Sequence, residues 1–253
     1  MHRTPRHQHP GPNPALASQP RNLGVAVLWL ALACGSAVAG DGLPGARVAV
    51  ARPSAAQQQA LDAAVTDYGL GRLERARAAF ELLADAGVAA AHYNLAVMQL
   101  RHEMPQARLE LAVEHLERAA AGGFVTAQHA LGEFYESGRY APRDLPRAMA
   151  WYERAAESGS VDSQVAIGTA YYLGRGVAHD AAQALHWYRE AAKAGDVGAQ
   201  YLLASMYEKG EGTSIDLRLA HYWYDIAARA GDVAAPGKRD EVARRMQAPA
   251  PPR

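Results

Sequence analysis

The sequence predicts an all-α protein: a right-handed α-α superhelix, or solenoid, of stacked helical hairpins with a period of 36 residues. Glycines recur at this period, an aromatic residue and an alanine pair precede most of them in constant phase, and the apolar residues between them have helical spacing. A fixed period of about 20–50 residues is typical of repeats that bury their hydrophobic faces only by stacking. The glycines are Gly87, Gly123, Gly159, Gly195 and Gly231.

The first helix of each unit is expected to alternate small and large residues, as in Val125 to Ser137. Small residues such as Ala127 and Gly132 let a neighbouring helix approach closely. A loop with two glycines follows in two units, from Gly174 to Asp180 and from Gly210 to Asp216, and these glycines fit a turn with positive φ angles.

The second helix of each unit has an apolar face. In one unit this face is formed at i, i+3, i+4 and i+7 by Ala148, Trp151, Tyr152 and Ala155. We therefore expect the Trp/Tyr pair to fill the core between repeats. An aspartate suited to accept hydrogen bonds from free backbone amides precedes this helix at Asp144, Asp180 and Asp216. The periodic glycine follows the helix and can adopt the left-handed conformation of a C-cap.

The run AGxxxAQxxLGxxYxxGxGVxxDxxxAxxWYxxAAxxG is matched closely by Gly159 to Gly195 and by Gly195 to Gly231. It resembles the Sel-one-like repeat, a relative of the tetratricopeptide repeat with a longer loop between its helices. The resemblance covers about Gly87 to Gly231, and Gly71 to Gly87 resembles the second half of a tetratricopeptide unit. It implies a family that assembles protein complexes in envelope, exopolysaccharide or host-contact systems.

The unit that begins at Gly87 departs from this pattern. Gln99 replaces the tyrosine, His115 replaces the tryptophan, and Arg101 to Ala107 replaces the glycine loop. We expect two helices here as well, joined by a loop of different geometry.

The ends of the chain differ from its middle. Leu23 to Ala39 is 17 residues without a charge, ends in an A-x-A pattern and follows Arg21, so residues 1–39 are predicted to be a signal peptide cleaved after Ala39. Two alternatives are an uncleaved inner-membrane anchor and a lipoprotein modified at Cys34. The sequence thus predicts an exported, periplasmic protein with a linker at 40–54, a solenoid at 55–246 and a disordered tail at 247–253.

Charge argues against nucleic-acid binding. Residues 1–39 contain three arginines and no acidic residue, so cleavage changes 26 basic and 26 acidic residues to 23 and 26, a net charge of −3. A mildly acidic chain without a basic run is poorly suited to a phosphate backbone. Membrane contact is expected only through an uncleaved or lipidated N-terminus.

The sequence shows no motif for catalysis, and we predict no catalytic residue, metal or cofactor. It lacks H-E-x-x-H, G-x-S-x-G and the S-x-x-K set, and the glycines of its G-x-G loops lie between helices. The alternative is a periplasmic hydrolase acting on cell-wall or β-lactam substrates, an activity linked to a cysteine-rich branch of the resembled family. That branch has a cysteine pair in each repeat, which this sequence lacks. A third alternative is an anchored spacer that binds nothing.

We expect the first helices to form a concave groove that binds a peptide or a loop of a protein partner, as in tetratricopeptide domains. This makes the chain a scaffold or adaptor of the cell envelope. Tyrosines among carboxylates suit an extended partner with some basic character. The predicted groove residues are Tyr93, Val97, Leu100, His129, Glu133, Glu136, Val165, Thr169, Tyr172, Tyr201, Ser205 and Glu208.

Overall fold

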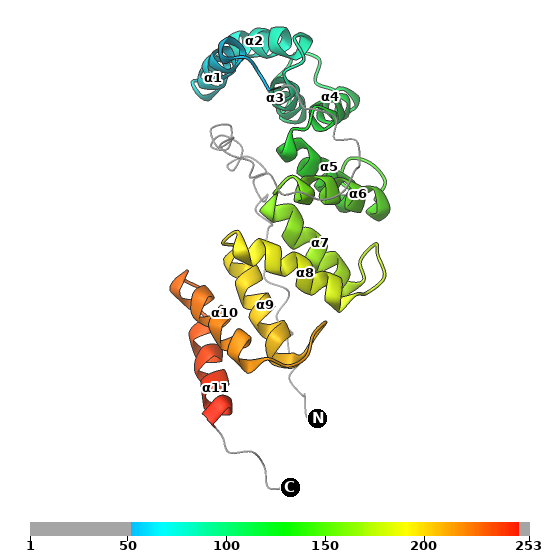
Figure 1. The fold of residues 1–253 in the computed structure, drawn as a ribbon. Helices are drawn as coiled ribbons and strands as arrows, with labels where there is room; N and C mark the ends of the chain where they lie inside the picture. Colours follow the sequence, from blue (N-terminus) through cyan, green and yellow to red (C-terminus); the bar gives the residue numbers. More distant parts are fainter. Residues whose placement is uncertain (1–51, 248–253) are drawn as a thin grey trace, which may run out of the picture. The chain divides into compact units, whose positions relative to one another are not determined.

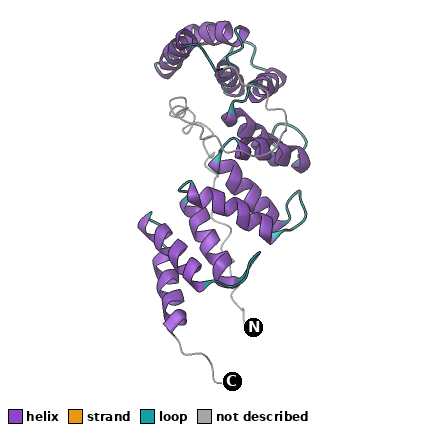
Figure 2. Cartoon of the chain, viewed as in Figure 1, coloured by secondary structure: helices purple, strands orange, loops and turns teal. Residues whose placement is uncertain are grey.

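A computed structural model describes residues 52–247, and this part of the chain contains eleven helices and no strand (Figures 1 and 2). The helices are α1 (Ala55–Gly69), α2 (Leu73–Asp85), α3 (Ala89–Leu100), α4 (Leu109–Ala121), α5 (Val125–Ser137), α6 (Leu145–Glu157), α7 (Val161–Leu173), α8 (Ala181–Lys193), α9 (Val197–Lys209), α10 (Leu217–Arg229) and α11 (Ala235–Gln247). Each helix packs against the next along the chain. The all-α solenoid of stacked hairpins is thus confirmed.

The helices repeat with the predicted period. The first helices α5, α7 and α9 begin at Val125, Val161 and Val197, each 36 residues after the one before. Helices α6, α8 and α10 are the second helices of the same units, and α3 and α4 form the unit before them. The irregular unit therefore has both of its expected helices.

The predicted caps are present at both ends of the second helices. The Asp144 carboxylate accepts from the Arg147 amide at 3.0 Å, and Asp180 and Asp216 cap α8 and α10 in the same way. At the other end of α8, Gly195 has a φ of 98° and donates its amide to the Ala192 carbonyl. The left-handed C-cap predicted for the periodic glycine is therefore confirmed.

The core consists of the alanines of the second helices and one aromatic residue per hairpin. Tyr152, Tyr188 and Tyr224 are buried, whereas Trp151 and its counterparts at 187 and 223 are only half-buried. The expectation that both members of the Trp/Tyr pair lie in the core was therefore wrong for the tryptophan. The Tyr152 ring packs against Gly132 of the first helix, whereas Trp151, about 100° further round α6, lies at the edge of the buried face and stays partly exposed. Trp151 instead lies against the Arg154 guanidinium, 4.7 Å from its ring centroid.

Small residues of the first helices allow close packing, as predicted. A Cβ added to Gly132 would collide with the ring of Tyr152, and one added to Gly168 would lie 2.9 Å from the ring of Tyr188. Tyr152 and Tyr188 therefore each pack their ring against a glycine of their own hairpin, and Tyr224 has Ala204 at the matching position.

The periodic glutamines connect consecutive units. Gln128 on α5 and Gln200 on α9 are buried, and their side-chain amides donate to the carbonyls of Ala120 and Ala192 at 3.1 and 3.3 Å. Those carbonyls belong to the last turn of the preceding second helix, where intrahelical donors run out. The glutamine thus caps one unit while belonging to the next.

The loop of the irregular unit has a left-handed residue at the same position as the other units, but this residue is a histidine and not a glycine. His102 has a φ of 56°, where the other units have Gly138, Gly174 and Gly210 with φ of 63°, 65° and 75°. Histidine tolerates this left-handed conformation at some energetic cost.

None of the helices in residues 52–247 is long and apolar enough to cross a membrane. The predicted signal peptide, most of the predicted linker and Cys34 lie outside the described residues.

Candidate functional site

The predicted groove residues lie on the first helices α3, α5, α7 and α9, but they differ in exposure. Tyr93 and Glu208 are buried at 7% relative exposure, whereas the Glu133 side chain is 47% exposed. Tyr93 packs on Phe124 with ring centroids 5.1 Å apart, and burial raises the pKa of its phenol to about 12. The other predicted residues are half-buried: Val97, Leu100, His129, Glu136, Val165, Thr169, Tyr172, Tyr201 and Ser205. Tyr93 and Glu208 therefore belong to the interior and not to an open groove.

A residue near the end of α5 and one near the end of α7 contact the following repeat. Glu136 on α5 accepts from the Arg175 guanidinium at 3.3 Å, and the Tyr172 hydroxyl on α7 donates to Glu211 at 3.0 Å. Arg175 and Glu211 are both the middle residue of a G-x-G loop and lie 39 residues after their partners. We call these two contacts the inter-repeat pairs. They connect neighbouring units by polar side chains as well as by the apolar core.

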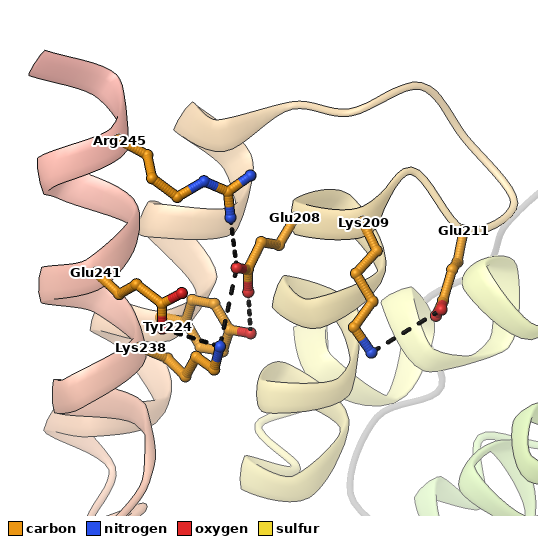
Figure 3. Close-up of polar contacts among 7 residues, drawn as sticks. All are labelled: Glu208, Lys209, Glu211, Tyr224, Lys238, Glu241 and Arg245. Atoms are coloured by element: carbon orange, nitrogen blue, oxygen red, sulfur yellow. Dashed lines mark hydrogen bonds and ion pairs between the residues drawn. The ribbon is translucent and has the colours of Figure 1, made fainter. Parts of the chain in front are cut away.

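Glu208 is the corresponding residue of the last unit, and α11 supplies its partners (Figure 3). Its carboxylate lies 2.6 Å from the Arg245 guanidinium and 3.9 Å from the Lys238 ammonium, and Lys238 also pairs with Glu241 at 3.0 Å. The Tyr224 hydroxyl donates to the second Glu208 oxygen at 2.9 Å. A buried carboxylate requires such partners because burial removes its hydration. We therefore interpret this cluster as the closure of the solenoid by α11.

The buried tyrosines connect the two helices of a hairpin. Tyr152 donates to Glu136 at 2.8 Å, whereas the Tyr188 hydroxyl lies 3.0 Å from the Thr169 hydroxyl. Burial, together with hydrogen bonding to a carboxylate, raises the pKa of Tyr152, and the same causes raise the pKa of Tyr224. These phenols therefore stay protonated and donate throughout the physiological range.

One group of side chains resembles a hydrolase nucleophile in composition. His129 Nδ1 lies 2.8 Å from Ser163 Oγ, and its Nε2 lies 3.7 Å from the Glu133 carboxylate. A serine beside an imidazole is the arrangement that activates a nucleophile. Ser163, however, is 0% exposed, so its hydroxyl is closed to substrate in this structure. The contact instead joins α5 to α7.

One hollow of the described surface lies away from the predicted groove residues. An open hollow of about 590 Å³ lies beside the loop between α5 and α6 and includes none of them. Within residues 52–247, no three metal-ligating side chains converge on one point.

Sequence reasoning missed Arg175, Glu211 and the basic residues of α11. The first two carried a signal: the middle residue of the G-x-G loop differs in charge between units whose surroundings are otherwise alike. A variable residue within a constant frame is a candidate for a specific pairing.

Stacked two-helix units with side chains offered along the first helices define an α-solenoid of the protein-binding repeat class. The chain belongs to the Sel1 repeat family, whose model matches residues 89–124, 125–160, 161–196 and 197–232. The Sel-one-like resemblance is thereby confirmed. Sel1 repeats typically mediate protein–protein interaction.

Two solved structures illustrate the likeness. A Sel1 repeat protein from Oxalobacter formigenes is 30% identical, with 71% of this chain and 75% of that chain covered and a TM-score of 0.61. A protective antigen present in uropathogenic Escherichia coli strains is also 30% identical, with 69% of this chain covered and a TM-score of 0.61. The chain covers only 36% of the length of that antigen. Among curated proteins, the comparison found no match.

Proposed function

We propose that the protein is a scaffold or adaptor of the cell envelope that binds a peptide or a loop of a partner protein along its first helices. The observation that supports this most directly is the pair of inter-repeat contacts, Glu136 with Arg175 and Tyr172 with Glu211. They fix the first helices in register, so side chains between them form a preorganised surface, which lowers the entropic cost of binding.

The surface proposed for the partner is the row of side chains that the pairs leave available. In consecutive units this row contains Val97, Glu133, Thr169 and Ser205, which lie 36 residues apart. Glu133 is the most exposed of the three carboxylates among the predicted groove residues, because Glu136 and Glu208 are covered by their pairs. A partner segment with a basic residue opposite Glu133 fits this row.

The binding test is affinity capture from membrane and periplasmic extracts. The bait is the chain lacking residues 1–39, compared with its Glu133→Lys and Val97→Asp variants. Glu157→Lys provides a control with the same charge change, since Glu157 is exposed on the second helix α6. A partner retained by wild type and by Glu157→Lys, but lost by both surface variants, is expected. A partner that both surface variants still capture would indicate that the binding site lies on the loops or the second helices.

We propose export on the basis of the uncharged segment from Leu23 to Ala39. Cell fractionation tests this: a free periplasmic product of the size expected after cleavage is predicted. A full-length product in the membrane fraction would favour the anchor. A membrane product that incorporates labelled fatty acid, and loses it in Cys34→Ser, would favour the lipoprotein.

We further propose that the protein acts by binding and not by catalysis, because the Ser163 hydroxyl is buried. Purified protein should not hydrolyse a chromogenic β-lactam. Turnover that disappears in Ser163→Ala or His129→Gln would establish the hydrolase alternative instead.

A further inference from the structure

The unit formed by α3 and α4 differs from the other units at two positions that touch each other. The period places His92 in the column of glutamines formed by Gln128, Gln164 and Gln200. It places His115 in the column of tryptophans formed by Trp151, Trp187 and Trp223. Two neutral side chains of the repeat are thus replaced together by two side chains that can take up protons near neutral pH.

The two imidazole rings share a direct hydrogen bond. His92 Nδ1 on α3 lies 3.1 Å from His115 Nδ1 on α4, with ring centroids 5.3 Å apart. A hydrogen bond between these nitrogens needs one N–H and one lone pair. The pair therefore accepts at most one proton while it is intact, because two imidazolium rings would place N–H against N–H.

The surroundings oppose protonation further. Burial is the largest cause that lowers the pKa of both histidines, and the Arg118 guanidinium on α4 adds to it. Carboxylates act in the opposite direction: Glu114 on both rings, Asp85 on His92 and Glu81 on His115. Arg77 on α2 lines the same hollow as Glu81 and His115, and its guanidinium pairs with Glu81 at 2.7 Å and with Glu74 at 2.8 Å. The net effect is a neutral pair at the contact between α3 and α4.

We propose that His92 and His115 form an acid-sensitive joint, which lets the unit of α3 and α4 open at mildly acidic pH while the other units stay closed. Below about pH 6.5 the open unit takes up two protons and the closed unit at most one, so the closed form loses stability as the pH falls. Helix α3 also carries Tyr93, Val97 and Leu100, so opening would remodel one end of the surface along the first helices. The joint itself does not depend on a partner binding there.

Hydrogen–deuterium exchange of the chain lacking residues 1–39 tests the joint, with rates corrected for the intrinsic effect of pH. Between about pH 7.5 and about pH 5.5, the equilibrium constant for opening of α3 and α4 is expected to increase by about 10- to 100-fold. The lower value applies if the open unit binds one proton more than the closed unit, and the higher value applies if it binds two more. The amides of α7 and α8 should not change. Variants His92→Gln and His115→Trp restore the residues of the other units, and each should reduce the response by about tenfold. His186→Gln, at an exposed histidine of α8, is the matched control and should leave it unchanged.

Either of two results would overturn the proposal. The first is an acid response of α3 and α4 no larger than that of α7 and α8 in the wild-type chain. The second is a full response that survives in both variants. If one variant does not fold, proton NMR of the wild-type chain decides: the joint requires at least one of His92 and His115 to titrate below about pH 6.5, the usual pKa of a histidine side chain.

Discussion

The buried tyrosines of the second helices provide a matched experiment on what holds a hairpin together. Tyr224 and Tyr188 occupy the same position of their repeats and are 0% and 2% exposed. The Tyr224 hydroxyl donates to the Glu208 carboxylate at 2.9 Å, whereas the Tyr188 hydroxyl pairs with the neutral Thr169 hydroxyl at 3.0 Å. Replacing each tyrosine with phenylalanine removes one oxygen and leaves the ring in place.

The expected magnitudes differ because the partners differ in charge. A hydrogen bond to a charged group contributes about 1.5–3 kcal/mol and one between neutral groups about 0.5–1.5 kcal/mol. Arg245 lies 2.6 Å from the other Glu208 oxygen, so this ion pair does not need the Tyr224 hydroxyl and should limit the loss. We therefore expect Tyr224→Phe to lower the free energy of unfolding by about 2 kcal/mol and Tyr188→Phe by about 1 kcal/mol.

Urea unfolding followed by far-UV circular dichroism measures both values, and an unchanged m-value would show that the variants unfold from the same native state. Tyr152→Phe should fall between the two, because its partner Glu136 is 32% exposed and partly hydrated. A loss in Tyr188→Phe equal to or larger than that in Tyr224→Phe would refute the reasoning, since packing and not the charge of the partner would then decide.

Four further changes test the repeat geometry. Gly195→Val should lower the free energy of unfolding by about 1 kcal/mol or more, because φ is 98° there; unchanged stability would contradict the cap. Gly132→Ala should lower it by about 1–3 kcal/mol in thermal unfolding, because the new Cβ meets the Tyr152 ring. His102→Gly should raise the free energy of unfolding, measured in urea, by about 0.5–1 kcal/mol, because glycine adopts the φ of 56° without the steric cost that histidine has there. Deletion of residues 160–195, one whole period, should leave a shorter folded protein, and a loss of helicity per residue would count against the solenoid.

The sequence was sufficient for features that depend on neighbours along the chain. Asp144 is recognisable as an N-cap because a cap needs only the next three amides, and the helical spacing places Tyr152 within the apolar face of its helix. Trp151 was misplaced because adjacent residues satisfy the same broad pattern, and only the position of the neighbouring helices selects between them. Which of the two side chains is buried therefore depends on the tertiary structure and not on the local sequence.

The candidate surface was less predictable, for a related reason. Glu208 matches Glu136 in the repeat, but it is buried because α11 covers it with Arg245 and Lys238. The period places Ala235 and Val242 of α11 at the positions of the buried Ala199 and Met206, but it does not indicate that basic side chains of α11 cover Glu208. Tyr93 is buried by an aromatic neighbour, Phe124, that the equivalent positions of other units do not have.

The inter-repeat pairs also imply that the order of the units matters. Glu136 is matched by Arg175, and Tyr172 by Glu211, so each loop suits only the unit before it. Deletion of residues 160–195 removes Arg175 and Tyr172 together and brings Glu211 opposite Glu136. The two carboxylates then face each other, and their repulsion should lower the free energy of unfolding by up to about 1 kcal/mol, since both side chains are partly exposed. Glu211→Arg in the shortened chain should recover this loss, whereas in the full-length chain it should remove the acceptor of Tyr172 and give no gain. If the substitution changed the free energy of unfolding equally in both chains, the contact of the loop residue with the preceding unit would not contribute to stability.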